Sequence, residues 1–476
     1  MKTLAGLDVG TTGCKLTVFT EEGEPLGREY RDYPATRATD AQEIDARALA
    51  AGVRDCIRAA KARFGRIDAM GVASFGEAFV LADGAGEPLR PILLCTDARG
   101  AEECRAFRER FGAGRAAEIA GVVPSESYSF PKLMWIKAHE ASLHARAKSA
   151  MLIEDYVIFL LTGRRAIDHS LAARTGAFDI RNCRWSHEIL DAAGLDAALF
   201  SEPVPTGSAV GTDADGTLVV AAGHDQVACA VGAGVFAPGT AAEGAGTVEC
   251  MTPVFERVPD TPRFALDNYC AVPYFGHYAT YAYSYTGGEL LRWCRDALCR
   301  DGHDGLQAGP YGGPTGLLVL PHFAGAATPY MDSGSRGAIV GLSLATTARD
   351  IYLGCMEAVA YEMRLNRDRL AASGVAFDRL VATGGGAKSR LWMQMKADVL
   401  GVPITALETE DAGAAGCAMM AGVASGAFSG LADAAARMVR PAATFSPDPV
   451  LHERYTEIYG RYEKLYEAVR PLVQTT

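Results

Sequence analysis

The chain has 476 residues, of which 49% are hydrophobic and 22% charged, a balance typical of a globular protein with large buried cores. That length accommodates roughly two to three domains. With 46 basic against 57 acidic residues the net charge is −11, which argues against nucleic-acid and anionic-membrane partners, because such binders carry a basic surplus. No apolar run is long enough to span a membrane. The twelve scattered cysteines indicate neither a zinc site nor a disulfide framework, so we expect reduced thiols and a cytoplasmic location.

Taken in chain order, the sequence predicts strands over 4–8, 14–20 and 25–30, joined by glycine turns. Apolar residues at helical spacing then predict a helix over 45–63. The elements expected after it are strands at 66–73 and 79–83, a buried helix over 150–162, a strand at 217–222, a strand leading into 384, a helix from about 389 to 401, and a closing helix over 451–469.

A strand–turn–strand unit at 240–251 echoes the opening segment. Gly10-Thr11 of the first unit falls on Gly246-Thr247 of the second, almost half the chain later, and Asp8 is matched by Gly244. The alternation of strands and helices also restarts near residue 240. Together these features favour a duplicated α/β fold.

The most specific segment runs from Leu7 to Lys15 (LDVGTTGCK). It is neither a Walker loop nor a dinucleotide fingerprint, because GxxxxGK[ST] and GxGxxG are both absent. Its backbone N–H groups and the hydroxyls of Thr11 and Thr12 can approach phosphate oxygens without a Cβ in the way. Asp8 could hold Mg²⁺, through water rather than directly, because Mg²⁺ gives up its water reluctantly. The alternative is a plain β-hairpin in which Asp8 caps the turn.

A second glycine cluster follows the strand expected before residue 384. Gly384, Gly385 and Gly386 would allow a flat group such as a purine ring to approach the backbone closely. The alternative is a crowded turn between a strand and a helix.

Two carboxylates also follow predicted strands. Asp225 lies in Gly223-His224-Asp225-Gln226, after the strand at 217–222, where it could accept the proton of a hydroxyl that attacks phosphorus; a helix N-cap is the alternative. His224 is expected to be structural. Glu77, in Ser74-Phe75-Gly76-Glu77, could accept hydrogen bonds from a polyol or could be a solvated loop residue.

Together these stretches resemble the FGGY family of carbohydrate kinases over about residues 3–430. Asp8–Thr12 and Gly246-Thr247 resemble the family's two phosphate turns, and Gly223–Gln226 resembles its catalytic Gly-x-Asp-Asn/Gln motif. The remaining matches are 129–135 (SFPKLMW), Thr328-Pro329-Tyr330, Arg336-Gly337, Gly341-Leu342 and the adenosine loop Gly384–Ala387. Each match alone is weak, and the ordered set is specific.

The resemblance implies two actin-like (ribonuclease H-like) ATPase domains flanking a central cleft, an N-terminal domain over 1–238 and a C-terminal domain over 239–476. It also implies ATP-dependent phosphorylation of a small sugar, ketose or polyol, xylulokinase-like, with gluconate, glycerol or another polyol as alternatives. Asp225 would be the general base, and Glu77 and Gln226 would contact the substrate beside it.

The resemblance further assigns Mg-ATP to both halves of the chain. Asp8 would serve Mg²⁺, and Thr11, Thr12, Gly246 and Thr247 would hold the β- and γ-phosphates. Gly384, Gly385 and Gly386 would flank adenosine. A homodimer is compatible with the family.

Several departures from the family pattern leave the substrate open. Gly325-Ala326-Ala327 stands where the family has Gly-Glu-Arg before Thr-Pro, and Gly76-Glu77 is not the Met-His pair of xylulokinases. The rival function is a non-catalytic sugar- or nucleotide-binding regulator, or an ATP-driven clamp on the same scaffold. The Gly223–Gln226 motif and Glu77 favour the kinase, because a clamp needs no base beside a polyol pocket.

Overall fold

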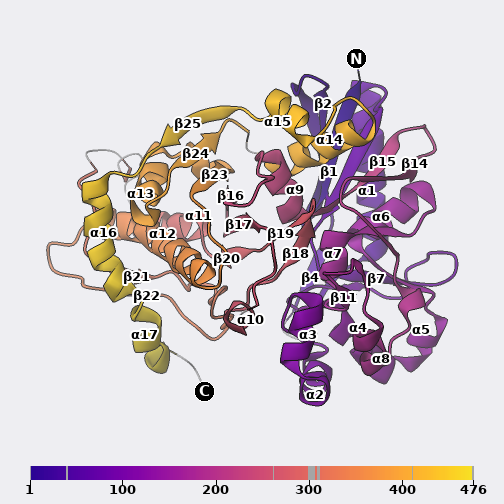
Figure 1. The fold of residues 1–476 in the computed structure, drawn as a ribbon, viewed down its shortest axis with the longest axis horizontal. Helices are drawn as coiled ribbons and strands as arrows, with labels where there is room; N and C mark the ends of the chain where they lie inside the picture. Colours follow the sequence, from indigo (N-terminus) through magenta and orange to yellow (C-terminus); the bar gives the residue numbers. More distant parts are fainter. Residues whose placement is uncertain are drawn as a thin grey trace. The chain divides into compact units, whose positions relative to one another are not determined.

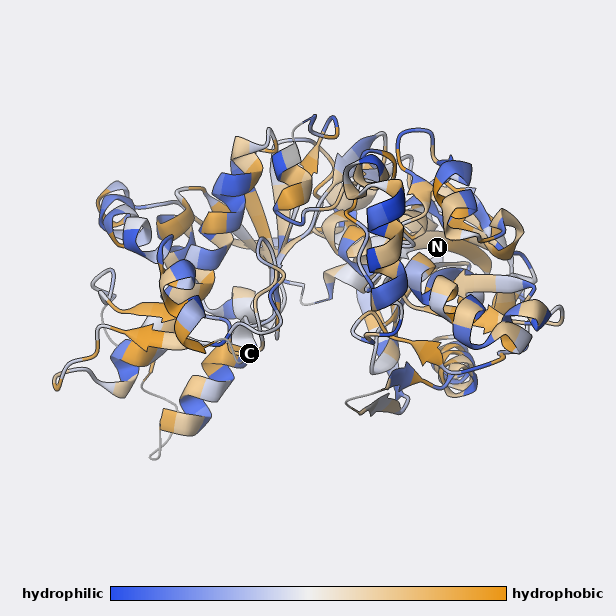
Figure 2. Ribbon diagram, turned by 90° about the horizontal axis from the view of Figure 1, so that it is seen from below, coloured by the Kyte–Doolittle hydropathy of each residue, from blue (hydrophilic) through white to orange (hydrophobic). Residues whose placement is uncertain are grey.

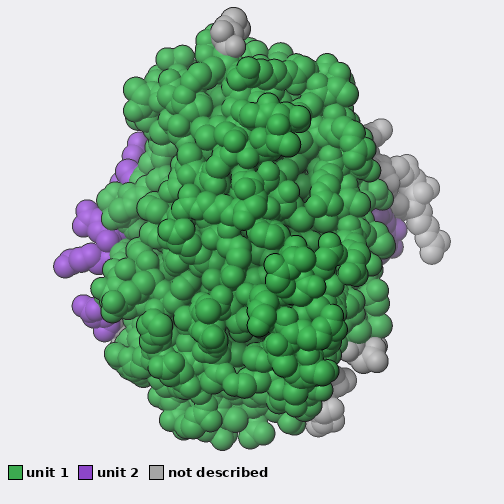
Figure 3. All heavy atoms as spheres, turned by 90° about the vertical axis from the view of Figure 1, so that its right-hand side faces the viewer, with its two compact units in different colours: residues 1–236, 270–279, 411–439 green, residues 237–269, 280–410, 440–476 purple. Residues whose placement is uncertain are grey.

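The structure is a computed structural model that describes residues 2–38, 41–260, 262–298, 306–307, 311–409 and 411–473 (Figure 1). By its internal contacts the chain divides into two compact units. Unit 1, green in Figure 3, comprises Met1–Phe236, Cys270–Ala279 and Asp411–Val439. Unit 2, purple in Figure 3, comprises Ala237–Tyr269, Thr280–Glu410 and Arg440–Thr476. Each unit is mixed α/β, as predicted.

Unit 1 is built on a six-stranded sheet in the order β14-β15-β6-β1-β2-β3. Its strands are β1 (Thr3–Val9), β2 (Gly13–Thr20), β3 (Pro25–Asp32), β6 (Ala69–Ser74), β14 (Ser208–Thr212) and β15 (Leu218–His224). β1 pairs antiparallel with β2 and parallel with β6, and β15 runs parallel to β6. Val9 aligns with Ser74, and Ser74 with His224, so β1, β6 and β15 end at the same level of one sheet edge. The loops that follow these three strands therefore begin side by side.

Helices cover both faces of this sheet. α1 (Ala46–Phe64) contacts β2 and β3, and α6 (Ile153–Thr162) contacts β6 and β15. Their apolar residues share one core with the alternate residues Ala5, Leu7 and Val9 of β1. On the other face, α9 (Asp225–Gly232) packs on β15, and α14 (Ala412–Ala424) packs on β1 and β6. The strands are accordingly mostly apolar, whereas many helices carry both hydrophilic and hydrophobic residues (Figure 2).

Glycines bring α14 unusually close to its neighbours. A Cβ added at Gly6 of β1 would lie 1.9 Å from the carbonyl oxygen of Ala414, and one at Gly416 would lie 1.9 Å from that of Ala228. Both positions require glycine because the backbones are nearly in contact. The first residues of α14 are thereby held beside the end of β1.

The rest of unit 1 consists of short elements. The strands are β4 (Ala35–Arg37), β5 (Gln42–Ile44), β7 (Phe79–Ala82), β8 (Ile92–Leu93), β9 (Ser149–Leu152), β10 (Ala166–Asp168), β11 (Phe178–Asp179), β12 (Arg184–Trp185), β13 (Glu202–Val204), β18 (Val272–Tyr274) and β19 (His277–Ala279). The helices are α2 (Ala101–Phe111), α3 (Ala113–Ala120), α4 (Ser129–His139), α5 (Ala141–Arg146), α7 (His169–Ala173), α8 (His187–Ala193), the 3-10 turn Ala197–Leu199 and α15 (Leu431–Met438).

Unit 2 repeats the plan of unit 1. Its strands are β16 (Thr240–Ala245), β17 (Glu249–Phe255), β20 (Ala282–Ser284), β21 (Leu318–Leu320), β22 (Ala338–Val340), β23 (Arg379–Thr383), β24 (Ile404–Leu407) and β25 (Pro441–Phe445). Its helices are α10 (Pro262–Leu266), α11 (Gly288–Leu298), α12 (Ala348–Ala372), the 3-10 turn Gly385–Lys388, α13 (Arg390–Leu400), α16 (Pro449–Tyr462) and α17 (Leu465–Val473).

The strand connections confirm the predicted duplication. β16 pairs antiparallel with β17 and parallel with β23, as β1 does with β2 and β6. β24 continues parallel to β23 and carries β25 antiparallel, as β15 follows β6 and carries β14. The fold is the two-domain, actin-like ATPase fold expected from the sequence.

Two predicted helices are corrected. In the segment 150–162, the first residues belong to β9, which pairs with β7, and the helix begins only at Ile153. An apolar run of this length fits a buried strand as well as a helix, so its composition could not separate them. The closing helix is two helices, α16 and α17, divided at 463–464. Helical spacing of the buried residues continues across the break and hides it.

In the part of the chain that the structure describes, no helix is both long and apolar enough to cross a membrane.

Candidate active site

Asp225 lies where β15 ends and α9 begins. The helix N-cap is His224, whose Nδ1 accepts a hydrogen bond from the backbone N–H of Gln226 at 3.3 Å. The alternative in which Asp225 itself caps the helix is therefore not what the structure shows. Asp225 is the first residue of the helix, at the level where β1 and β6 also end. It is left available for another role.

The carboxyl group of Asp225 is partly buried. Its Oδ1 is buried without a hydrogen-bond partner, while the side chain as a whole is 35% exposed. Burial, with the negative charges of Asp8 and Glu77, raises the pKa of Asp225 to about 7, although hydrogen bonding by Gln226 opposes the rise. Asp225 is therefore a carboxylate that can take up a proton near neutral pH.

The neighbouring His224 ring is held neutral. Burial, followed by the positive charge of Arg174, lowers the pKa of His224 well below its usual value. Nδ1 of His224 lies 3.1 Å from Oδ1 of Asp225 and already accepts a hydrogen bond from Gln226. A neutral ring in this state offers Oδ1 a second acceptor rather than a donor, which fits an Asp225 that readily holds a proton.

Asp8 lies opposite Lys15 in the β1–β2 hairpin. Nζ of Lys15 is 3.7 Å from Oδ2 of Asp8 and 2.9 Å from Oδ1 of Asp411, the residue that caps α14. Burial raises the pKa of Asp8 although Lys15 opposes it, and the carboxylates of Asp411 and Asp8 raise the pKa of Lys15 although burial opposes them. Two carboxylates thus share one ammonium beside the first glycine turn. Neither Lys15 nor Asp411 was predicted. The signal for Lys15 is a lysine two positions after Gly13, and the signal for Asp411 is an aspartate before a run of small residues.

The first glycine turn is the tip of that hairpin. The N–H of Gly10 donates to the carbonyl oxygen of Gly13 at 2.9 Å, and Thr12 is exposed. Tyr33 of the segment after β3 donates its hydroxyl to the Gly10 carbonyl oxygen and its N–H to that of Thr12. The segment is therefore a β-hairpin, in which the Asp8 carboxylate lies near Lys15 and Tyr33 holds the Gly-Thr turn.

Glu77 is buried, so it is not a solvated loop residue. It has a φ of 64°, which is unusual for a residue with a Cβ. Its carbonyl oxygen accepts a hydrogen bond from Ser129 at 2.6 Å, and its Oε1 accepts one from Nε of Arg174 at 2.6 Å. Arg174 was not predicted, because it lies 97 residues away in the sequence. A strained conformation held by two distant partners is typical of a functional site.

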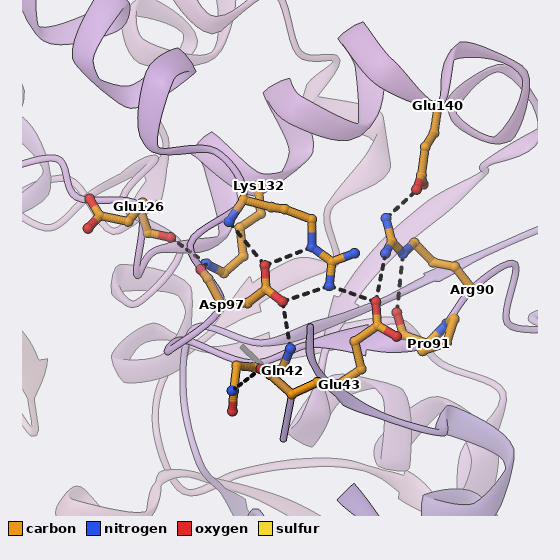
Figure 4. Close-up of polar contacts among 10 residues, drawn as sticks. Gln42, Glu43, Arg90, Pro91, Asp97, Glu126, Lys132 and Glu140 are labelled. Atoms are coloured by element: carbon orange, nitrogen blue, oxygen red, sulfur yellow. Dashed lines mark hydrogen bonds and ion pairs between the residues drawn. The ribbon is translucent and has the colours of Figure 1, made fainter. Parts of the chain in front are cut away.

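A network of polar contacts in unit 1 includes Asp97, Glu126 and Lys132 (Figure 4). Lys132, which belongs to the predicted SFPKLMW motif, is buried and donates to the carbonyl oxygens of Asp97, at 2.7 Å, and Glu126. The Asp97 carboxylate accepts hydrogen bonds from Arg99 and from the backbone of Gln42. The motif lysine therefore ties two loops together, including the one that leads to Tyr128 and Ser129.

Unit 2 presents its glycines at the corresponding sheet edge. Gly246, Thr247 and Val248 form an exposed turn between β16 and β17. Gly384 follows β23 with a φ of 89°, and a Cβ there would lie 2.7 Å from the carbonyl oxygen of Ala245. Gly384 therefore packs against Ala245, the residue before Gly246, and glycine is required at 384.

A fully buried ion cluster lies beneath these turns. Nζ of Lys396, from α13, is 3.0 Å from Oε1 of Glu243 and also contacts Oε1 of Glu249. All three side chains are buried. Burial and the nearby Glu243 raise the pKa of Glu249 well above its usual value, although Lys396 opposes the rise. The cluster connects α13 to both strands of the hairpin that carries Gly246-Thr247.

The predicted residues thus fall into two groups. Unit 1 brings together the first turn and the acidic positions, namely Asp8, Thr11, Thr12, Glu77, Asp225 and Gln226. Unit 2 brings together Gly246, Thr247, Gly384, Gly385 and Gly386.

These groups fit the expected ligands. Among the described residues, no three His, Cys, Asp or Glu side chains are grouped to hold a metal ion. Mg²⁺ in kinases is held by one or two carboxylates together with water and phosphate oxygens, and Asp8 and Asp411 can supply the carboxylates. A Cβ at Gly385 would meet nothing within 4 Å, so a flat ring could lie against that residue. The exposed side chains of Thr12 and Thr247 carry hydroxyls that suit phosphate oxygens.

Two actin-like units, each with a glycine turn at the end of its central strands, define the class of actin-like ATPase folds. Comparison with known proteins identifies the family. Residues 3–232 match the N-terminal domain, and residues 267–425 the C-terminal domain, of the FGGY family of carbohydrate kinases. The chain belongs to this family, whose members are ATP-dependent phosphotransferases.

Relatives align along nearly the whole chain. The xylulose kinase of Bacillus subtilis is 26% identical, over 99% of this chain and 98% of its own. The glycerol kinase of Symbiobacterium thermophilum is 29% identical, over 98% and 97%. The crystal structure of a xylulose kinase from Brucella ovis superposes with a TM-score of 0.90 at 26% identity, over 99% of this chain and all of that chain. The relatives thus differ in the sugar or polyol for which they are named.

Proposed function

We propose that this carbohydrate kinase transfers the γ-phosphoryl group of Mg-ATP to a hydroxyl of a small sugar, ketose or polyol, in the manner of a xylulokinase, with Asp225 as the general base. Asp225 is the observation that carries the proposal. Its partly exposed carboxylate has a pKa of about 7 and stands at the sheet edge where β1, which leads into the first glycine turn, also ends. A base with that pKa is half deprotonated at neutral pH and can accept the proton of the attacking hydroxyl.

The other residues position the reactants. Mg²⁺, when bound, neutralises charge on the transferred group. Asp8, with Asp411 beside it, would hold that ion through water. Thr11, Thr12, Gly246 and Thr247 would hold the β- and γ-phosphates, and Gly384, Gly385 and Gly386 would flank adenosine. Lys15, between Asp8 and Asp411, adds a positive charge close to the first turn.

The acceptor would lie against Glu77 and Gln226, next to Asp225. Xylulose is the first candidate, because two of the relatives named above are xylulose kinases; glycerol, gluconate or another polyol is the alternative. A non-catalytic regulator is less well supported, because it would have no use for an aspartate whose pKa is raised to neutrality.

The test is ADP release by the wild type and by the Asp225→Asn variant, with pentuloses, hexuloses, aldonates and polyols as acceptors. Asparagine preserves shape but cannot accept the proton, so we expect turnover to fall by about 10²–10⁴-fold while the affinity for an ATP analogue stays within about twofold. Fluorescence titration of the analogue serves as the folding control. Retained sugar turnover in Asp225→Asn would remove Asp225 from the role of base.

A further inference from the structure

The end of β15 is irregular just before Asp225. β15 runs in register with β6 as far as Ala221, and the register resumes only at Gly223, so Ala222 is an extra residue that forms a β-bulge. Gly223 has a φ of 93°, and a Cβ there would lie 2.7 Å from Oγ of Ser170. Glycine is therefore required at the bulge, and the bulge sets the direction in which the chain enters α9.

Two side chains accept hydrogen bonds from the backbone at this bulge. The N–H of Gly223 donates to Oε1 of Glu154, the second residue of α6, at 2.7 Å. The N–H of His224 donates to Oγ of Ser170, in α7, at 3.0 Å. Both hydrogen bonds are buried. Because a buried N–H group without an acceptor is costly, these two bonds favour the one backbone conformation that leads into Asp225.

Glu154 and Ser170 are joined to each other through Asp168. Oε2 of Glu154 accepts a hydrogen bond from the backbone N–H of Asp168 at 3.0 Å, and the hydroxyl of Ser170 donates to Oδ1 of Asp168 at 3.1 Å. The Asp168 side chain also caps α7. Burial, followed by the charge of Asp168, raises the pKa of Glu154 well above its usual value. The bulge is thus connected to α6 and α7 by one set of buried hydrogen bonds.

The proposed chemistry does not use Glu154 directly. Its side chain is fully buried, and each of its two oxygens accepts a hydrogen bond from a backbone N–H group, so it cannot touch a substrate. Any effect on the reaction must therefore pass through the backbone that it holds. Asp225 lies two residues after Gly223, and a displacement of about 1 Å in a reacting group can lower a rate by about 10²-fold.

We propose that Glu154 is a positioning residue for phosphoryl transfer. Together with Ser170 it holds the bulge at Gly223. The bulge in turn places Asp225 so that one carboxyl oxygen is buried beside His224 while the rest of the side chain is partly exposed. This inference rests on the proposed function, in which Asp225 is the base, and it goes beyond that function by assigning the residue that places the base.

The first experiment measures kinetics in Glu154→Gln. Glutamine has the size of glutamate but only one acceptor oxygen, so its NH2 group faces one of the two backbone N–H groups. We expect kcat to fall by about tenfold or more while KM for ATP stays within about twofold. If Asp225 becomes less buried, the inflection in the pH profile of kcat/KM should also move down by about half a pH unit or more. An unchanged kcat and inflection would overturn the inference.

Asp155 supplies the matched control. It is the next residue of α6 and is also fully buried, but its carboxyl group accepts a hydrogen bond from Ser201. Burial raises its pKa to about 8, as burial also raises the pKa of Glu154. Asp155→Asn should lower the thermal midpoint but leave the pH inflection in place. If Asp155→Asn moves the inflection as far as Glu154→Gln does, the effect is one of general stability and the inference fails.

Amide hydrogen exchange tests the geometry without any acceptor. In the full-length protein, exchange within residues 219–226 should be faster in Glu154→Gln by about tenfold or more, and should stay at the wild-type rate in Asp155→Asn. Wild-type exchange in Glu154→Gln would contradict the inference. Absence of turnover by the wild type with every acceptor would instead count against the proposed function, whereas exchange would still show whether Glu154 holds the bulge.

Ser170→Ala tests the same loop if Glu154→Gln does not fold. It removes the acceptor of the His224 N–H group and leaves Glu154 in place. We expect kcat to fall and the pH inflection to move in the same direction as in Glu154→Gln, with KM for ATP again within about twofold. A folded Ser170→Ala protein with the kcat, pH inflection and exchange of the wild type would show that the buried hydrogen bonds do not place Asp225.

Discussion

Asp225 shows how a single carboxyl group can be tuned by its position. One oxygen is buried beside a neutral imidazole, the rest of the group is partly exposed, and the charges of Asp8 and Glu77 add to the effect of burial. An exposed aspartate has a pKa of about 4 and would be a poor proton acceptor at neutral pH. The environment of Asp225 brings the pKa to about 7, where proton transfer is most effective.

This pKa predicts the pH dependence of the reaction. Because Asp225 must be deprotonated to act as the base, kcat/KM for the acceptor should fall about tenfold for each pH unit below 7 and level off above about 8. The measurement is initial-rate kinetics between pH 5.5 and 9, with the coupling enzymes assayed separately at each pH. A profile that is flat from pH 5.5 to 8 would contradict the assignment.

Because its pKa is raised, Asp225 lowers the free energy of unfolding at high pH. Its folded pKa lies above the unfolded value, so between pH 4 and 7 the folded state binds more protons, and the free energy of unfolding declines as pH rises through 7. Asp225→Asn carries no charge, so it should be more stable than the wild type at pH 8, by about 1 kcal/mol after allowance for partial exposure. Urea unfolding of both proteins at pH 5 and pH 8 measures this difference.

The sequence could single out Asp8, Glu77 and Asp225 as candidates, because each lies near the end of a recognisable strand and close to a glycine. It could not identify Arg174, which reaches Glu77 from 97 positions away, or Asp411, which meets Lys15 only because α14 packs against β1. Contacts of this kind depend on how distant segments pack. No local pattern of residue types encodes them.

At the scale of elements, the buried cluster of Lys396, Glu243 and Glu249 fixes one helix against a hairpin. Lys396 reaches both strands from α13, and the Gly384 loop that leads toward α13 touches Ala245 at the end of β16. A buried ion cluster contributes little more to the free energy of unfolding than apolar side chains of the same size would. Removing one of its members, however, leaves a buried charge without a partner. Its function here is to hold α13 and the β16–β17 turn in a single arrangement.

Lys396→Met should therefore destabilise the protein by about 3–5 kcal/mol, because it leaves two buried carboxyl groups without their cation. The neutral triple variant Lys396→Met, Glu243→Gln, Glu249→Gln should recover most of that loss. Urea unfolding monitored by circular dichroism provides both values. A triple variant no more stable than Lys396→Met would show that lost packing, rather than unpaired charge, is responsible.

Element boundaries were predictable where a glycine or a cap marks them. Gly401 ends α13 as expected, in the left-handed conformation that helix ends favour. The division of 150–162 into β9 and α6 has no such marker, since Leu152 and Ile153 continue one apolar run. Residues 149–152 form a strand because β9 pairs with β7, and that pairing is a tertiary contact.

For the molecule as a whole, the important feature is that the chain returns to unit 1 after completing most of unit 2. The segment Asp411–Val439 supplies α14, which covers β1 and β6 and packs along α9. Within the repeated plan, α14 follows β24 as α9 follows β15. The apolar, small-residue composition of α14 predicts a buried helix but does not reveal which sheet it covers.

Gly416 of α14 allows the packing of this returning segment within unit 1 to be tested. A Cβ at Gly416 would lie 1.9 Å from the carbonyl oxygen of Ala228, so Gly416→Ala should force α9 and α14 apart and lower the free energy of unfolding by about 3 kcal/mol. Gly460, in α16, has nothing within 4 Å of its added Cβ, so Gly460→Ala should be neutral or stabilising by up to about 1 kcal/mol. Both substitutions gain the same helix propensity, and their difference therefore isolates the contact.

Hydrogen exchange then locates the effect within the chain. If α14 is part of the core of unit 1, Gly416→Ala should speed exchange in β1, β6 and α9, which α14 contacts directly. β23 and β24, at the centre of the other sheet, should keep the protection they have in the wild type and in Gly460→Ala. Faster exchange confined to β23 and β24 would mean that α14 supports unit 2 instead, and that Asp411 is not held beside Lys15 by its packing on β1.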